Sequence, residues 1–175
     1  MVKSDMDRDH WSWTPLVAVG MLEFGMRRSE VAAALGRSTA DDDDRLGAVG
    51  HEHFPRQGVS AYYTTAGHLA AVALSALTGP QVTLGGISLV GQSIGEPAGG
   101  LWSPTLERFH DYAKQHGMKA SWLPSGDPAL QQYGLVLRRV RVGDVVLSRP
   151  LLMYSGWTWG AWEEFIPDEE WTAGP

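Results

Sequence analysis

The spacing of apolar residues in the first half of the chain predicts one short helix and several strands. Val31 and Leu35 lie at i and i+4, which predicts a helix over about residues 28–35 with one buried face and an end at Gly36. Apolar runs predict strands at 16–21, 59–65 and 69–77, and a hairpin of 81–84 with 87–90 around Gly85-Gly86. The run from residue 69 is rich in alanine, so a buried helix is the alternative there. Residues 37–58 are polar and turn-rich and are expected to form a loop with room for one short strand.

The second half shows the same order, a helix followed by strands. Ser103 followed by Pro104 predicts a helix start, and Gly117 marks its end. The apolar stripe of this helix consists of Leu106, Phe109 and Ala113. A strand is expected at 119–123, then a turn at 124–128, then a hairpin of 135–142 with 145–154 joined by Gly143-Asp144. Pro150 cannot donate to a neighbouring strand and is expected near a sheet edge or a strand break.

This order predicts an α+β fold in which two short helices pack on a mainly antiparallel sheet. We expect a single domain over residues 15–175, with a degenerate helix-plus-strands repeat dividing it into halves 15–95 and 96–175. Residues 1–14 are polar and are expected to form a loose arm that docks through Trp11 and Trp13.

Composition narrows the classes of function. The 175 residues include no cysteine, which excludes disulfides, thiol nucleophiles and cysteine-ligated zinc. The polar N-terminus has no apolar segment typical of a secretion signal, and no stretch is long and apolar enough to span a bilayer, so a cytoplasmic location and no membrane contact are expected. The net charge of −6 argues against nucleic-acid binding and suits a basic protein partner.

The only close cluster of side chains that could hold a metal is His51-Glu52-His53. In a strand the two histidines would point the same way, and a carboxylate from Asp41–Asp44 could complete a site for a small metal-assisted hydrolase. No third ligand stands at a useful spacing, and the aspartate run lacks the glycine that a calcium-binding loop needs at its sixth position. We therefore expect exposed loop residues here, no metal and no cofactor.

Aromatic residues near the end of the chain are the strongest candidates for binding a partner. Tryptophan is enriched at interface hot spots, and an acidic rim steers a basic partner. The candidate partner-binding residues are Tyr154, Trp157, Trp159, Trp162, Glu163 and Glu164. Tyr62 and Tyr63 form a second, weaker aromatic candidate. The alternative is that the tryptophans close the core and cap the last strand.

The segment Phe24-Gly25-Met26-Arg27-Arg28-Ser29-Glu30-Val31 resembles the F-G-M-[ST]-x-x-[EQ]-V segment that opens each repeat of the beta-lactamase inhibitor protein family. It departs from that pattern at Arg27, where the family has serine or threonine. The resemblance implies a helix pair packed on a four-stranded antiparallel sheet whose aromatic-rich concave surface binds a protein. The remainder is similar to uncharacterised actinobacterial proteins, some of immunity type. The segment itself is also explained by packing, as a joint between a strand and a helix.

These observations favour a non-enzymatic protein-binding module of inhibitor or immunity type. The alternatives are the small metal-assisted hydrolase and a structural subunit that self-associates, for example as a homodimer.

Overall fold

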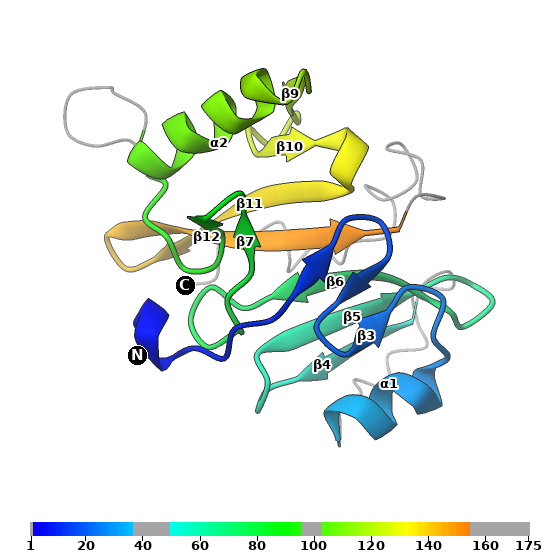
Figure 1. Cartoon of the computed structure of the whole chain (residues 1–175). Helices are drawn as coiled ribbons and strands as arrows, with labels where there is room; N and C mark the ends of the chain where they lie inside the picture. The colour runs from blue at the N-terminus through cyan, green and yellow to red at the C-terminus, as the bar shows by residue number, and fades with distance from the viewer. Residues whose placement is uncertain (1, 37–49, 96–102, 155–175) are drawn as a thin grey trace.

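A computed structural model describes residues 2–36, 50–95 and 103–154 and confirms the α+β fold with a mainly antiparallel sheet (Figure 1). The central element is a seven-stranded antiparallel sheet. Its strands, in spatial order, are β4 (His51–Phe54), β5 (Val59–Tyr63), β6 (Leu69–Leu74), β12 (Val145–Met153), β11 (Leu135–Val142), β10 (Pro128–Leu130) and β9 (Ala120–Trp122).

Two α-helices, two small sheets and two 3₁₀ turns complete the described part of the chain. The helices are α1 (Arg28–Leu35) and α2 (Pro104–Gln115), and the 3₁₀ turns are Asp5–Asp7 and Gln131–Tyr133. The small sheets are formed by β1 (Trp13–Thr14), β2 (Ala18–Val19) and β3 (Leu22–Glu23), and by β7 (Thr83–Leu84) with β8 (Ile87–Ser88). Neither described helix combines the length and apolar content needed to cross a membrane.

The seven-stranded sheet consists of two halves that meet at the pair β6–β12. The first half runs α1, β4, β5, β6, and the second runs α2, β9, β10, β11, β12, so each half is a helix followed by an antiparallel meander. At the junction Ala73, Val72 and Ala71 of β6 lie opposite residues 151–153 of β12. The repeat expected from the sequence is therefore visible in the topology.

Both helices pack on the same side of this sheet, here called the first face. Strand residues alternate between the two faces, so Val72 and Leu152 point to the first face while their neighbours Ala73 and Leu151 point to the opposite, second face. The main core lies on the first face and contains buried residues of both helices, namely Val31, Leu35, Leu106, Phe109 and Ala113. The small sheet β1–β3 contributes to the same core through Val19 and Leu22.

The apolar run at 16–21 is not one strand. It bends through Gly20, whose φ is +60°, and continues into the tight meander of β2 and β3. The chain then reaches α1 through Gly25, whose φ of +95° favours glycine. The Gly25 N–H donates to Leu69 O at 2.8 Å, and Leu69 N–H donates to Met26 O at 2.7 Å, so this joint is bonded to the start of β6. The structure thus confirms the segment as a strand-to-helix joint.

Two short strands of the large sheet lie where the sequence mainly predicts loop or turn. The short strand allowed for within 37–58 is β4, whose four residues pair with β5, whereas β10 is not predicted and begins at the end of the expected turn 124–128. Both strands are short, so their periodicity is too brief to be distinguished from a loop. The alanine-rich run at 69 is a strand, and its alternative as a buried helix is wrong.

Pro150 lies where β12 changes its neighbour. Ser148 N–H donates to Gln92 O at 2.8 Å, and Tyr154 N–H donates to Ala70 O at 3.1 Å. Backbone groups alternate along a strand, so the nitrogen of Pro150 faces this same side, between the segment at residue 92 and β6. Proline is accommodated at this break in the pairing, as the sequence predicted.

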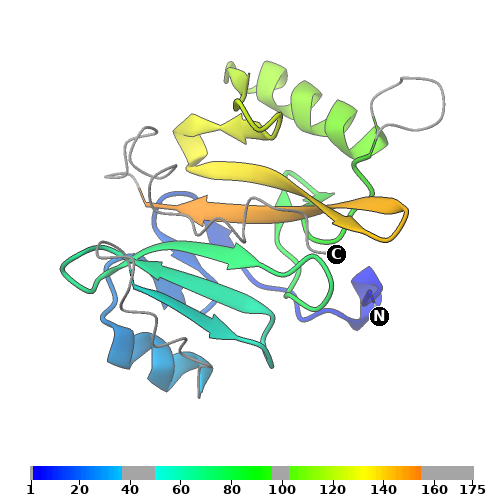
Figure 2. The ribbon, with the colours of Figure 1, turned by 180° about the vertical axis from the view of Figure 1, so that it is seen from behind.

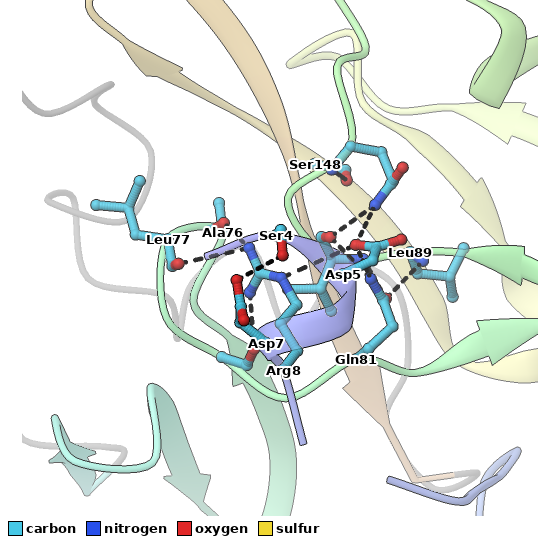
Figure 3. A network of polar contacts seen from close by, with 12 residues as sticks. Ser4, Asp5, Asp7, Arg8, Ala76, Leu77, Gln81, Leu89 and Ser148 are labelled. Carbon is cyan, nitrogen blue, oxygen red and sulfur yellow. Dashed lines mark hydrogen bonds and ion pairs between the residues drawn. The ribbon is translucent and has the colours of Figure 1, made fainter. Parts of the chain in front are cut away.

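The N-terminal arm is fixed by a buried arginine as well as by its tryptophans (Figure 3). Arg8 is 4% exposed, and its guanidinium donates to the carbonyl oxygens of Gly79 at 2.7 Å and Ala76 at 2.8 Å. The Asp5 carboxylate accepts from the amides of Gln81 at 2.8 Å and Gln92 at 2.9 Å. The arm therefore holds together the turn after β6 and the segment that pairs with β12.

We expect Arg8→Ala to lower the free energy of unfolding by about 3 kcal/mol, because it leaves buried carbonyls at Ala76 and Gly79 without a donor. Arg8→Lys should lower the free energy of unfolding by less, since lysine keeps a charged donor, although it lacks the planar guanidinium that reaches both carbonyls. Urea denaturation monitored by circular dichroism measures both. A change no larger than that of the exposed control Lys3→Ala would contradict this role.

Candidate functional site

The second face of the seven-stranded sheet lies opposite the face on which the two helices pack. Its apolar residues form a cluster of their own that is separate from the main core. They are Tyr62, Ala71, Ala73, Ala129, Val136, Leu151 and Met153, with the partly buried Leu123 beside them. Viewed from behind, no coloured helix or strand crosses this face (Figure 2).

A row of polar side chains crosses the same face and is here called the polar row. Arg138 Nε lies 3.6 Å from Asp127 Oδ2, and both side chains are 5% exposed. On the neighbouring strand, Arg149 Nη2 donates to Ser60 Oγ at 3.3 Å, and Ser60 Oγ shares a 3.1 Å hydrogen bond with His53 Nδ1. The row therefore extends from the start of β10 to the edge strand β4.

Strand register explains why these groups meet. Arg138 and Arg149 are directly opposite each other in the β11–β12 hairpin, and Asp127 lies two residues before Ala129, on the same face. Arg149 reaches Ser60 across β6 because β6 presents only small side chains here, Ala71 and Ala73.

Burial sets the electrostatics of the row. Desolvation lowers the pKa of Arg138, an effect that the nearby Asp127 carboxylate opposes and Arg149 reinforces. Desolvation also raises the pKa of Tyr62, while the nearby charge of Arg149 acts in the opposite direction. The polar row therefore places two neighbouring guanidinium groups and the Asp127 carboxylate together on a largely dry face.

Tyr62 and Tyr63 lie on opposite sides of the sheet and both are buried, with 1% and 0% exposure. Tyr63 belongs to the main core, where its hydroxyl donates to Glu52 Oε2 at 2.6 Å and the Arg28 guanidinium lies 4.9 Å from its ring centre. Tyr62 lies on the second face and stacks on His51 with ring centres 5.1 Å apart. Neither ring of the weaker aromatic candidate is at the surface, because β5 is an interior strand of the sheet and all five of its residues are buried.

His51, Glu52 and His53 form part of strand β4 rather than an exposed loop. Both histidines point to the second face, as a strand predicts, but Glu52 points to the first face and bonds Tyr63. Among the described residues no group of three or more metal-capable side chains is close enough to hold an ion. The carboxylates Asp41–Asp44 lie outside the described residues.

Of the predicted aromatic site that begins at residue 154, Tyr154 alone belongs to the described part of the chain. It is partly buried, its N–H bonds Ala70 O, and it forms a bridge with Leu16. The other predicted binding residues lie outside the described part of the chain; they are Trp157, Trp159, Trp162, Glu163 and Glu164.

Of the polar row, only His53 stands out in the sequence. Arg138, Arg149, Asp127 and Ser60 do not, because each lies in a different stretch of the chain or in a strand with several charged residues. The available signal was the alternation of β11, which places Arg138 on the same side as Val136 and so on a buried face.

Comparison of the sequence with protein-family models found no match, and neither curated proteins nor solved structures gave one.

We expect Asp127→Asn to lower the free energy of unfolding by about 3 kcal/mol, because it removes the carboxylate of a buried ion pair with Arg138. Urea denaturation at neutral pH measures the loss. The matched control is Asp111→Asn on the exposed side of α2, which should be nearly neutral. If Asp127→Asn lowers the free energy of unfolding by less than about 1 kcal/mol, the ion pair with Arg138 contributes little to stability.

The buried Tyr63 predicts alkaline sensitivity. Desolvation, and then the hydrogen bond to Glu52, raise its pKa above the ordinary value of about 10, so the unfolded chain releases this proton first. Its contribution to stability is complete below pH about 10 and falls above that by about 1.4 kcal/mol per pH unit. Tyr63→Phe should remove that part of the slope in urea titrations from pH 8 to 11.5. Parallel curves for the two proteins would contradict the assignment.

Proposed function

We propose that this protein is a non-enzymatic protein-binding module of inhibitor or immunity type. Its contact surface is the aromatic and acidic segment that begins at the end of β12. The proposed contact residues are Tyr154, Trp157, Trp159, Trp162, Glu163 and Glu164.

One observation carries this proposal: β12 is an interior strand, and the chain leaves it at Tyr154 in the middle of the sheet. The segment 155–175 therefore starts beside a broad, rigid sheet whose first face is already occupied by both helices. A recognition segment anchored on a rigid element loses less conformational freedom on binding than a freely moving one.

The chemistry of the segment defines the partner class. Tryptophan side chains supply large contact areas, and residues 155–175 contain five carboxylates and no lysine or arginine. With the net charge of −6, this favours a protein partner with a basic surface, whose association is accelerated by electrostatic steering.

The test is capture of the partner from the source organism, followed by calorimetric titration of the purified partner. We expect one partner per chain, and Trp157→Ala/Trp159→Ala should weaken binding by a factor of about 30 or more, since each hot-spot residue contributes about 2 kcal/mol. Glu163→Gln/Glu164→Gln should mainly slow association and reduce the salt dependence.

The matched control is Trp122→Ala, which removes a tryptophan that is 47% exposed on β9, far along the sheet from β12. Equal weakening by this control, or no weakening by the double tryptophan variant, would overturn the proposed surface. Sedimentation at two concentrations separates this function from self-association, which would appear as concentration-dependent dimer formation.

A further inference from the structure

The N-terminal arm binds the rest of the chain through two charged side chains rather than through apolar ones. Residues 2–9 contribute no side chain to either apolar cluster of the described residues, and Met6 is 94% exposed. By contrast, Arg8 is buried and Asp5 is partly buried. The 3₁₀ turn Asp5–Asp7 places these two side chains, which are three positions apart, on one side of the arm. The docked element is therefore a short motif, a carboxylate followed three residues later by an arginine.

The arginine is received by backbone carbonyl oxygens in the turn after β6 (Figure 3). Arg8 Nη1 donates to Gly79 O at 2.7 Å, and Arg8 Nη2 donates to Ala76 O at 2.8 Å. The turn keeps its shape through bonds of its own, because Gly79 N–H donates to Ser75 O at 2.9 Å and Ser75 N–H donates to Gly58 O at 2.8 Å. These bonds do not involve the arm, so this part of the site is preorganised for a guanidinium group.

The carboxylate is received by two glutamine amides. Asp5 Oδ1 accepts from Gln81 Nε2 at 2.8 Å and from Gln92 Nε2 at 2.9 Å. Gln81 Oε1 in turn accepts from the N–H groups of Leu89 at 3.0 Å and Val90 at 2.8 Å. Gln92 Nε2 also donates to Val90 O at 3.0 Å. Both amides are thus oriented by groups outside the arm, with donors that suit a carboxylate.

The arm itself does not use every donor of its arginine. Arg8 Nε is buried and has no hydrogen-bond acceptor among the described residues. Asp5 Oδ1 lies 4.0 Å from it, which is beyond hydrogen-bond distance. A buried donor without an acceptor costs free energy, so a ligand whose carboxylate lies closer to the guanidinium would bind this site more favourably than the arm does.

We propose that this site, here called the arm cradle, is a peptide-binding site that the arm of the same chain occupies in the free protein. The arm cradle consists of the carbonyl oxygens of Ala76 and Gly79 and the side-chain amides of Gln81 and Gln92. Its ligand is a segment of a partner protein with a carboxylate three residues before an arginine, and this segment displaces the arm. Because the arm buries no apolar side chain, it leaves the cradle while both apolar clusters stay intact. This inference does not rest on the proposed function, whose contact residues begin at Tyr154.

Hydrogen exchange in the full-length protein tests whether the arm leaves the cradle. Lys3 N–H donates to Leu77 O at 2.9 Å, and Gln81 N–H donates to Asp9 O at 2.7 Å, so both amide protons are hydrogen-bonded only while the arm is docked. We expect them to exchange at least about 10-fold faster than the amide protons of β6, because the arm opens without unfolding of the sheet. Equal exchange rates would overturn the proposal, since the arm would then leave only when the whole protein unfolds.

A fluorescent peptide that reproduces residues 2–9 tests the site directly by anisotropy. The full-length Asp5→Ala/Arg8→Ala variant, whose arm lacks both anchors, should bind this peptide at least about 30-fold more tightly than the wild-type protein, in which the arm competes. A peptide with Arg8→Lys should bind the variant at least about 10-fold more weakly, because lysine lacks the planar fork. A peptide that keeps only Asp5 and Arg8 among glycines and serines should bind within about 10-fold of the original, since a few residues supply most of the binding energy.

The matched control is Lys3→Ala, a change at an exposed arm residue that should leave peptide binding as weak as in the wild-type protein. The proposal would be wrong if the wild-type protein and the folded double variant bound the peptide equally, or if the glycine-serine peptide did not bind. A dimer formed on mixing the double variant with wild-type chains, detected by sedimentation, would assign the cradle to the arm of a second copy instead of a partner. If circular dichroism shows that the double variant is unfolded, the hydrogen-exchange experiment on the wild-type protein decides.

Discussion

The structure depends on β12, an interior strand that is paired along both edges. One edge pairs with β11 from Val145 to Leu152, and the other pairs with β6 over 151–153 and contacts the segment at residue 92. This single strand joins two helix-plus-meander halves that would otherwise present open edges, which sheets rarely leave unprotected. The N-terminal arm strengthens the same junction, because Arg8 and Asp5 bind the turn after β6 and the segment beside β12.

Pairing at β12 also determines where charge is buried. Once β11 and β12 are in register, Arg138 and Arg149 become neighbours on the second face, and the alanines of β6 allow Arg149 to reach Ser60. Burying guanidinium groups has a desolvation cost, so such residues are retained where a carboxylate meets them with good geometry. Asp127 is such a carboxylate, because its Oδ2 lies 3.6 Å from Arg138 Nε and both side chains are buried.

The candidate site was only partly predictable. The aromatic and acidic residues after Tyr154 stand out in the sequence because tryptophans and carboxylates are concentrated there. The alternation of His51 and His53 was also predictable, since a strand places them on one side. Asp127 and Arg149 were not, because each comes from a different strand and a one-residue change of register would turn either side chain to the opposite face.

The sequence by itself determined the local elements whose signals lie within a few residues. Helix spacing and caps specified α1 and α2, and two-residue turns specified the hairpins at Gly85-Gly86 and Gly143-Asp144. Only the tertiary structure decided that β6 pairs with β12, that β10 is a strand, which residues of 37–58 form β4, and that Tyr62 and Tyr63 are both buried. The physical reason is that strand pairing and face burial are long-range properties, fixed by contacts between residues tens of positions apart, whereas propensities and turns act locally.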